Sequence, residues 1–404
     1  MRSLIILKGA SKVYKKMWVE KERMSNYFLD INVIRHLYAT PDLISPSSAI
    51  LGKSFGDTVY RRFLEAVCLR MIRGCLIVVD PETEQCEEIE TLAFIFGYKV
   101  FYVVQQVPQD YVEKSRKYSI PYYPIKRKSE LEKEVAQFKS FNKSGKEIIN
   151  SFSDVQDYWI KDTKKRGQIV KANKVLLVSD VHSNTDLLKK LPKFSEYEKI
   201  VFFGDYIDGP EEGGSRKMID KVLKSKSDRL LWLEGNHELR LRKYLGYLMT
   251  REFGKRRLAD LLYSTITDDF LRGTASEFSN IPGTVAKDYL TKMNDKLVMF
   301  AIINGKYICT HSGLRFKEQL DPRFIGNVIY GNRDIGRVDR DFSAAHEKLG
   351  MWSIHAHCKY FDQWEPQRYD RVVNLDPPSE EELVYGTLIN DEIKICLLER
   401  SQSE

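Results

Sequence analysis

Residues 174–180 read KVLLVSD, residues 199–205 read KIVFFGD and residues 229–236 read RLLWLEGN. Each segment is a short apolar run that ends in polar residues. Runs of this kind are typical of buried strands in a parallel α/β sheet, where the carboxyl ends of the strands deliver functional side chains to one edge. The fold predicted for this half of the chain is therefore an α/β sheet with its functional groups at the strand ends.

Two hairpin signals follow in the same half of the chain. Asn304-Gly305 interrupts the apolar run at 297–310, and Asn390-Asp391 separates the runs LVYGTLI and EIKICLL. Asn-Gly and similar pairs supply the positive φ angles that tight hairpin turns need. Together with RVVNLD at 371–376, these segments predict the remaining strands of the C-terminal half.

The first hundred residues alternate strand and helix signals. Short apolar runs occur at 3–7, 27–29, 76–79 and 100–104. A helix capped by Asp57 is predicted before the third run, because its apolar positions keep helical spacing as far as Gly74, and another helix ends at Gly97. Strands that alternate with helices predict a parallel, doubly wound sheet in an N-terminal domain.

A basic segment without a sheet pattern lies between these two regions. From Glu113 to Lys174 it has sixteen Lys and Arg against eight Asp and Glu, which accounts for the net charge of +7. Aromatic residues are interleaved with this charge, namely Tyr118, Tyr122, Tyr123, Phe141 and Trp159. Basic groups with nearby aromatics suit a nucleic-acid strand, and a solvated helical connector suits the same composition. No strand is predicted here before Lys174.

Length and composition indicate a two-domain globular protein. The 404 residues divide into an N-terminal domain at 1–112, a basic helical lid or connector at 113–173 and a C-terminal domain at 174–404. The apolar fraction of 43% is ordinary, and the six cysteines show no paired spacing. No apolar run approaches the roughly 20 residues of a membrane span. We therefore expect a cytoplasmic protein with reduced cysteines and no membrane partner.

The strongest functional signal is a spaced set of metal-ligating residue types, which includes five of the seven histidines. In chain order, the set comprises Asp180 with His182, Asp205, Asn236 with His237, His311, and His355 with His357. A dinuclear site needs oxygen and imidazole donors from several segments, with one carboxylate shared between the ions. Because these segments follow apolar runs, strand ends can bring the donors together.

The donors can be divided between two ions. The prediction assigns Asp180, His182 and His357 to one ion, Asn236, His311 and His355 to the other, and Asp205 to both. Two ions about 4 Å apart clamp a phosphoryl group and acidify a water for in-line attack on phosphorus. His237 directly follows a ligand, so we expect it beside the ions, where it can protonate the leaving oxygen.

The order DxH, GDxxD, GNHE, HSG and HxH resembles the calcineurin-like metallophosphoesterase superfamily over about residues 174–398. This resemblance implies a two-sheet αββα sandwich with metals at the strand ends. It also implies a hydrolase with two divalent cations, most often Mn²⁺, with Ni²⁺, Fe, Zn²⁺ or Mg²⁺ as alternatives. Asp208, the second carboxylate of GDxxD, can orient His237, and a turn-stabilising role fits it equally.

The chain departs from this family where phosphate-binding arginines are common. Gly209 follows GDxxD and Glu234 precedes GNHE, at two positions where the branch with the protein phosphatases tends to carry Arg. Ile354 stands where a Gly usually precedes the HxH pair. Arginines from elsewhere must then hold the phosphate, and the candidates are Arg216, Arg240 and Arg315.

The N-terminal domain carries GASKVYKK at 9–16, directly after its first predicted strand. A working phosphate loop reads GxxxxGK[ST]. Gly9 and Lys15 are in register with it, whereas Tyr14 replaces the second glycine and Lys16 replaces the hydroxyl that would hold Mg²⁺. The order of this loop, LDINVIRHLY and GCLIVVDPETEQ resembles the kinase domain of polynucleotide kinase/phosphatase enzymes over about residues 1–120.

In that kinase family an Asp-x-x-Arg motif supplies the general base and a phosphate contact. Here the motif reads Asn32-Val-Ile-Arg35, so Arg35 matches and the base does not. A glycine, a magnesium ligand and a base are thus missing, which predicts a degenerate P-loop-type domain that no longer transfers phosphoryl groups. Asp30 is close enough in sequence to be an alternative base.

Together these features predict a metal-dependent phosphatase of nucleic-acid ends with a kinase-inactive N-terminal domain. It would remove 3′ phosphate or open 2′,3′-cyclic phosphate on single-stranded RNA in end repair. The domain order resembles end-healing enzymes that prepare broken RNA for a ligase, which would here be a separate protein. Three alternatives remain: a protein Ser/Thr or small-nucleotide metallophosphatase, an active 5′-kinase/phosphatase, and a binding module with an incidental hydrolase.

Overall fold

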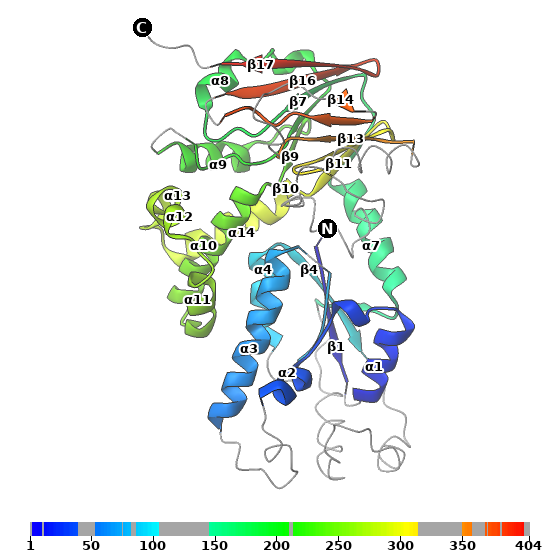
Figure 1. Ribbon diagram of the computed structural model, residues 1–404, viewed down its shortest axis with the longest axis vertical. Coiled ribbons are helices and arrows are strands. Elements are labelled where there is room, and N and C mark those ends of the chain that lie inside the picture. Colours follow the sequence, from blue (N-terminus) through cyan, green and yellow to red (C-terminus); the bar gives the residue numbers. More distant parts are fainter. Residues whose placement is uncertain are drawn as a thin grey trace.

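Three β-sheets organise the chain (Figure 1). The computed structural model describes residues 2–9, 12–38, 53–74, 76–81, 86–104, 145–209, 213–313, 350–357, 368–369, 371–379 and 382–399. The first sheet has the strand order β2-β3-β1-β4-β5, the second β10-β9-β8-β7-β16-β17, and the third β14-β15-β13-β12-β11-β6. The predicted α/β class is therefore correct for the part of the chain that is described.

The first sheet is parallel throughout, as the alternation of strands and helices predicts. Its central strand is buried along its whole length, which explains its continuous apolar sequence. Its strands are β1 (Arg2–Lys8), β2 (Phe28–Asp30), β3 (Ile77–Asp80), β4 (Tyr98–Val104) and β5 (Glu147–Ile149). Its helices are α1 (Lys12–Lys21), η1 (Ser25–Tyr27), α2 (Ile31–Tyr38), α3 (Lys53–Ile72) and α4 (Cys86–Ile95).

Two sequence predictions for this region are wrong. Helix α3 begins at Lys53, so Asp57 lies inside the helix instead of capping it. The segment before Lys174 does contain strands: β5 pairs with β4 of the first sheet, and β6 (Ile169–Val170) pairs with β11 of the third. Helix α7 (Phe152–Lys165) connects them. This part of the basic segment therefore joins two sheets.

The second and third sheets form a sandwich, because the apolar faces of their strands pack into one core. The second sheet contains β7 (Lys174–Val178), β8 (Lys199–Phe202), β9 (Leu230–Leu233), β10 (Leu297–Val298), β16 (Leu383–Ile389) and β17 (Glu392–Leu398). The third contains β6, β11 (Phe300–Ile303), β12 (Tyr307–Thr310), β13 (Trp352–His355), β14 (Arg368–Tyr369) and β15 (Val372–Asn374). Both predicted hairpins are confirmed, with positive φ at Asn304, Gly305, Asn390 and Asp391.

Helices flank the sandwich and extend from it towards the first sheet (Figure 1). They are α8 (Thr185–Lys190), η3 (Phe194–Glu196), α9 (Gly214–Lys224), α10 (Asn236–Glu252), α11 (Arg256–Tyr263), α12 (Asp268–Arg272), α13 (Thr274–Phe278) and α14 (Gly283–Lys296). Among the described residues, no helix has the length and apolar character that a membrane crossing requires.

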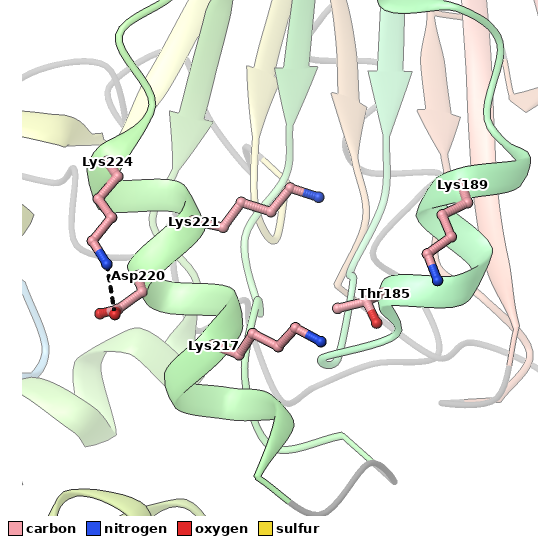
Figure 2. A pocket seen from close by; sticks show the side chains of 6 residues that line it. All are labelled: Thr185, Lys189, Lys217, Asp220, Lys221 and Lys224. Atoms are coloured by element: carbon pink, nitrogen blue, oxygen red, sulfur yellow. Dashed lines mark hydrogen bonds and ion pairs between the residues drawn. The ribbon is translucent and has the colours of Figure 1, made fainter.

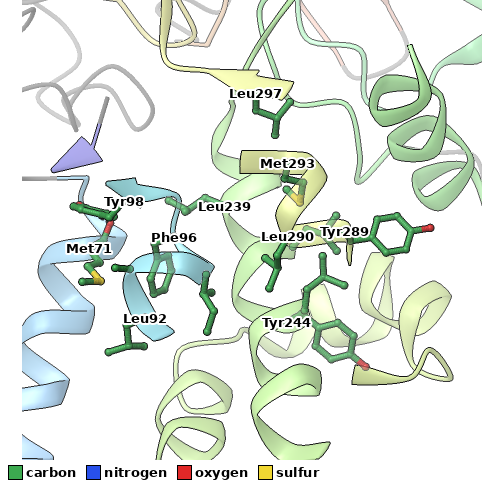
Figure 3. Packing of buried hydrophobic residues seen from close by; sticks show 14 of the residues in the cluster. Met71, Leu92, Phe96, Tyr98, Leu239, Tyr244, Tyr289, Leu290, Met293 and Leu297 are labelled. Atoms are coloured by element: carbon green, nitrogen blue, oxygen red, sulfur yellow. Dashed lines mark hydrogen bonds between the residues drawn. The ribbon is translucent and has the colours of Figure 1, made fainter. Parts of the chain in front are cut away.

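One apolar core joins the first sheet to the C-terminal helices (Figure 3). A Cβ atom on Gly246 of α10 would lie 2.7 Å from the side chain of Ile95 in α4, so these helices approach closely there. The labelled side chains in Figure 3 are Met71, Leu92, Phe96 and Tyr98 from the N-terminal part, and Leu239, Tyr244, Tyr289, Leu290, Met293 and Leu297 from the C-terminal part. The two parts are therefore packed together as well as connected.

A buried ion cluster crosses the same contact. Arg2 Nη1 in β1 lies 2.9 Å from Glu234 Oε2, and Arg242 Nε in α10 donates to the other oxygen of this carboxylate. Burial opposes ionisation of Glu234, but the two guanidinium groups offset it and hold the pKa of this carboxyl below its usual value. The Glu at the position before GNHE thus has a structural role that an arginine could not fill.

Candidate active site

The site lies where strands of the sandwich end. Asp180 follows β7, Asp205 follows β8, and Asn236 begins α10 directly after β9, all in the second sheet. His311 follows β12 and His357 follows β13 in the third sheet. Parallel pairing of β7 with β8 and of β8 with β9 brings their carboxyl ends to one edge. The sequence motifs meet at that edge because each one terminates a strand.

The loops that carry these residues adopt unusual backbone conformations. His182, Asp205 and Asp208 have positive φ angles of 44°, 45° and 62°. Non-glycine residues in this region are uncommon and concentrate at functional sites. Gly204, with φ at 109°, is needed because a Cβ there would lie 2.7 Å from the backbone nitrogen of Gly235. The glycines of GD and GN therefore allow the two loops to touch.

Glu238 connects these two loops by hydrogen bonds. Its fully buried carboxylate accepts hydrogen bonds from the backbone N–H groups of Asp205 at 2.9 Å, Tyr206 at 2.8 Å and Gly235 at 3.0 Å. Burial and the charge of Asp205 raise the pKa of Glu238 to about 7. Sequence reasoning quoted this residue within GNHE without giving it a role. A Glu in the first turn of a helix that follows a strand, as Glu238 is in α10, can accept hydrogen bonds from the backbone before the helix, and this position was the signal in the sequence.

Four potential metal ligands cluster at the centre of the site. One donor atom from each of Asp180, Asp205, His311 and His357 can be chosen so that all four atoms lie within 4.8 Å of one another. The side chains of Asp180, Asp205 and His311 are almost completely buried, whereas that of His357 is 36% exposed. The cluster thus has one side open to solvent, where a substrate can approach.

The two oxygens of Asp205 face different partners. Oδ1 lies 3.5 Å from His311 Nε2, which is itself 3.0 Å from Asn236 Oδ1. Oδ2 lies 3.6 Å from His357 Nδ1, which is 3.8 Å from Asp180 Oδ2. His311 Nδ1 is 2.6 Å from the Phe203 carbonyl, so it carries a proton, and Nε2 is the ring nitrogen that faces Asp205 and Asn236.

The electrostatics of this cluster favour bound cations. Burial raises the pKa of Asp180 well above its usual value, against the effect of His311. Burial also opposes ionisation of Asp205, but nearby His237 and His311 hold its pKa well below the usual range. Asp180 Oδ1 and Asp205 Oδ2 are buried and accept no hydrogen bond from any residue that the structure describes. Buried carboxylate oxygens of this kind cost free energy unless they are paired or coordinate a metal.

His237 and Asp208 form a pair beside the cluster. His237 Nδ1 lies 2.6 Å from Asp208 Oδ2, and Nε2 points towards Asp205, with its Oδ2 at 3.6 Å. Burial lowers the pKa of His237, but the two carboxylates more than offset this effect and raise it to about 9. His237 is therefore protonated at neutral pH, with Asp208 accepting from Nδ1 and Nε2 directed at the cluster.

A family profile described as calcineurin-like phosphoesterase matches residues 173–389, which is more than half of the 404 residues. The chain belongs to the calcineurin-like phosphoesterase family. A solved protein serine/threonine phosphatase from Saccharomyces cerevisiae, described as similar to human phosphatase PP5, is 12% identical with a TM-score of 0.37, over 64% of this chain and 92% of that one. The search of curated proteins found no match.

The family assignment and the ligand cluster together identify a metal-dependent phosphoesterase. Of the other ligands predicted for this calcineurin-like domain, His182 stacks edge-on against His237 with ring centroids 5.1 Å apart. His355 is fully buried at the end of β13. Neither residue belongs to the group of four whose ligand atoms lie within 4.8 Å of one another.

The predicted phosphate-binding arginines have different surroundings. Arg240 Nη1 lies 3.9 Å from Asp208 Oδ2 and its side chain is 44% exposed, so it borders the His237 pair of this phosphoesterase. Arg216 instead contacts α13, with its guanidinium 3.4 Å from the Glu277 carbonyl and over the ring of Phe278. Arg315 lies outside the described residues.

Sequence reasoning missed two hydroxyl residues that contact Asp208. Thr274 Oγ1 in α13 donates to Asp208 Oδ1, and Ser215 Oγ in α9 accepts from the Asp208 backbone N–H at 3.1 Å. The two hydroxyls are 2.8 Å apart. No motif surrounds either residue, so nothing in the sequence indicated their role in this phosphoesterase site.

Lys15, in helix α1 of the N-terminal part, belongs to a second buried ion pair. Lys15 Nζ lies 2.5 Å from Asp80 Oδ1 at the end of β3, and both side chains are at most 7% exposed. Gly9 follows β1 with φ at 144°. Arg35 Nη1 donates to Asn32 Oδ1 at 2.6 Å, and Asn32 donates in turn to Asp30. Lys15 and Arg35 are thus both engaged with neighbouring side chains.

Proposed function

We propose that this metallophosphoesterase acts on nucleic-acid ends, where it removes 3′ phosphate or opens 2′,3′-cyclic phosphate. The observation that carries the hydrolytic part is a buried carboxylate and histidine cluster next to a protonated His237–Asp208 pair. The nucleic-acid part is supported by the excess positive charge of the segment before Lys174 and by the P-loop-like order of the N-terminal part. Single-stranded RNA is the proposed partner, and sealing would need a separate ligase.

The donor set fits two divalent cations. Asn236, His311 and Asp205 Oδ1 would hold one ion, and Asp180, His357 and Asp205 Oδ2 the other, which keeps Asp205 shared. His182 and His355 are the proposed remaining ligands. Mixed carboxylate, amide and imidazole donors suit Mn²⁺, and Fe, Ni²⁺, Zn²⁺ or Mg²⁺ remain alternatives. Bound ions would supply a clamp on the phosphoryl oxygens and an acidified water for in-line attack.

His237 would act as the general acid. Asp208 accepts from Nδ1, so Nε2 is the nitrogen that faces the cluster and would carry the transferred proton. Transfer of that proton to the leaving oxygen neutralises the charge that develops as the P–O bond breaks. Asp208 fixes the ring by accepting from Nδ1, and Arg240 next to it is placed to contact a phosphate oxygen.

The N-terminal part would be a P-loop-type domain without kinase activity. Its support is the arrangement of a central β1, the turn at Gly9 and the following α1. Lys15 is neutralised by Asp80, and the oxygen of Asp30 accepts two hydrogen bonds from Asn32. A lysine that is already paired and an amide at the position of the base both oppose phosphoryl transfer.

The test uses purified protein with Mn²⁺ and oligonucleotides that carry 3′-phosphate, 2′,3′-cyclic phosphate or 5′-phosphate ends, alongside a phosphopeptide. We expect release from the 3′ ends, and none from the variant Asp205→Asn. Hydrolysis of the phosphopeptide alone would contradict the proposal and favour a protein phosphatase. In a parallel assay with ATP and a 5′-hydroxyl strand, phosphoryl transfer would contradict the assignment of an inactive kinase domain.

A further inference from the structure

A basic pocket lies between α8 and α9 (Figure 2). Its volume is about 460 Å³, and six residues line it: Thr185, Lys189, Lys217, Asp220, Lys221 and Lys224. Figure 2 shows Lys217 and Lys221 reaching from α9 across the gap towards α8. Four of the six lining residues are lysines, and none is apolar.

The acidic groups near this pocket neutralise only part of its charge. Lys224 Nζ lies 3.0 Å from Asp220, and Lys189 Nζ lies 2.6 Å from Asp186. Within the described residues, Lys217 and Lys221 form no ion pair with a carboxylate. They are four positions apart on one face of α9, where like charges repel at a cost of about 0.2–0.5 kcal/mol. A bound anion would remove this repulsion.

The pocket begins at the catalytic loops and leads away from them. Helix α8 starts at Thr185, three residues after the candidate ligand His182. In the first turn of α9, Ser215 binds the backbone of Asp208, and Lys217 follows two residues later. Thr185 and Lys217 therefore mark the end of the pocket nearest the metal cluster, and Lys221 and Lys224 lie further along α9 (Figure 2).

We infer that this pocket binds the sugar-phosphate backbone of the strand whose end is hydrolysed, an inference that rests on the proposed function. Lysines are effective point charges for phosphates, and backbone contacts position a strand without reading its sequence. The four lysines of the lining are distributed along two helices, which suits the repeated charges of a strand backbone better than the single phosphate of a phosphopeptide. The charge and the lining thus favour a nucleic-acid strand over an acidic peptide.

The test compares Lys217→Gln/Lys221→Gln with the matched control Lys193→Gln/Lys226→Gln, which removes the same charge from exposed lysines outside the pocket. Binding of a labelled 3′-phosphorylated oligonucleotide to metal-free protein is measured by fluorescence anisotropy across a salt series. The slope of log affinity against log salt should fall by about 1.4 in the pocket variant, since each lost single-strand phosphate contact removes about 0.7. The control should keep the wild-type slope.

Turnover separates this inference from the proposed function. With bound Mn²⁺, hydrolysis of p-nitrophenyl phosphate should be unchanged in the pocket variant, because that substrate has no backbone. Equal slopes for the variant and the control, or weaker binding of an acidic phosphopeptide only, would overturn the pocket assignment. Strand binding that depends on the pocket, without any hydrolysis of strand ends, would uphold the pocket and overturn the proposed reaction.

A different observation carries a second inference. Thr274, Ser215 and Asp208 form a closed ring of hydrogen bonds in which each group both donates and accepts. Ser215 Oγ–H donates to Thr274 Oγ1 at 2.8 Å, Thr274 donates to Asp208 Oδ1, and the Asp208 N–H donates to Ser215 Oγ at 3.1 Å. Thr274 and Ser215 are each 3% exposed. The ring fixes the carboxylate whose other oxygen binds His237.

We propose that Thr274 is a positioning residue for the proposed acid His237, a role that also rests on the proposed function. It holds Asp208 in the orientation that presents Oδ2 to His237 Nδ1. Thr274 comes from α13, which is 66 positions from Asp208, so a C-terminal helix completes a catalytic pair from the strand ends. Without this hydroxyl, Asp208 can rotate and the ring of His237 loses its fixed direction.

The variant Thr274→Val keeps the side-chain shape and removes the hydroxyl. With Mn²⁺, kcat should fall about 10-fold for phenyl phosphate, a fraction of the 10²–10⁴ that a general acid contributes. It should change little for p-nitrophenyl phosphate, whose leaving group needs no proton. Thr274→Ser should restore the phenyl phosphate rate. An equal loss for both substrates, or no rescue by serine, would show a merely structural role and overturn the inference.

Discussion

The cluster around Asp205 and the pair Lys15–Asp80 are both buried charged sites after parallel strands, and they differ in whether the chain balances its own charge. At the first, Asp180 Oδ1 and Asp205 Oδ2 have no hydrogen-bond partner within the described part of the chain. At the second, a lysine lies 2.5 Å from a carboxylate and neutralises it. One site is open to cations and the other is closed by an internal ion pair.

The contrast between the two sites indicates where chemistry can occur. Buried carboxylate oxygens that lack a hydrogen bond are costly, so a chain that keeps two of them is expected to recover the cost by binding cations. A buried lysine and carboxylate in contact leave little attraction for an external phosphate. The open cluster is therefore expected to determine activity, and the closed pair is expected to determine stability.

The largest effect should follow from removal of the shared carboxylate at the open site. Asp205→Asn should lower kcat/KM for p-nitrophenyl phosphate about 10³-fold, because metal clamping contributes several kcal/mol to transition-state stabilisation. Metal content, measured by inductively coupled plasma mass spectrometry, should fall in parallel. The control Asp288→Asn changes an exposed carboxylate that pairs with Lys292 at 2.6 Å. Full activity of Asp205→Asn would refute the role of the cluster.

At the closed site, loss of one partner should affect stability instead. Lys15→Met leaves Asp80 buried without its cation, so the free energy of unfolding should fall by about 3–5 kcal/mol. The double variant Lys15→Met/Asp80→Asn should recover most of this loss, because no charge remains buried. Urea denaturation measures both, and the Mn²⁺-dependent kcat should stay at the wild-type value. If Lys15→Met lost activity without losing stability, the closed pair would determine activity, which contradicts the comparison.

The meeting of Asp180 and Asp205 at one sheet edge could be predicted from the sequence, because the motifs that contain them directly follow the apolar runs of two strands. Asp180 and Asp205 end apolar runs, so the edge at which they meet follows from parallel strand order. The hairpin at Asn304 was equally predictable, because the positive φ of its turn depends on the turn residues themselves. Such features depend on residues that are neighbours in the chain.

Features that depend on tertiary contacts were not predictable. Strands β5 and β6 have three and two residues in a basic segment, too short for any hydrophobic period, and only their partner strands make them strands. Thr274 reaches Asp208 from a five-residue helix with no motif. The pairing of Lys15 with Asp80, 65 positions away, likewise needed the packed sheet.

Metal removal should distinguish the two sites by a smaller effect. Saturation of metal-free protein with Mn²⁺ at 100 times its Kd should add about 2.7 kcal/mol of stability by mass action. Differential scanning fluorimetry should show a corresponding rise in Tm for the wild type and for Lys15→Met. Asp205→Asn should show no such rise. A metal-dependent shift that persists in Asp205→Asn would place the ions elsewhere in the chain.

The smallest expected effect comes from opening the closed site. Asp80→Asn removes the carboxylate that neutralises Lys15, so a buried cation next to the turn at Gly9 becomes available to an external anion. Inorganic phosphate at ten times its Kd would then stabilise this variant by about 1.4 kcal/mol. Wild-type protein should show no phosphate-dependent shift in Tm, with chloride at equal ionic strength as the control in both cases. If phosphate stabilises both proteins equally, Asp80 does not prevent anion binding at Lys15. The contrast between an open and a closed site would then not hold.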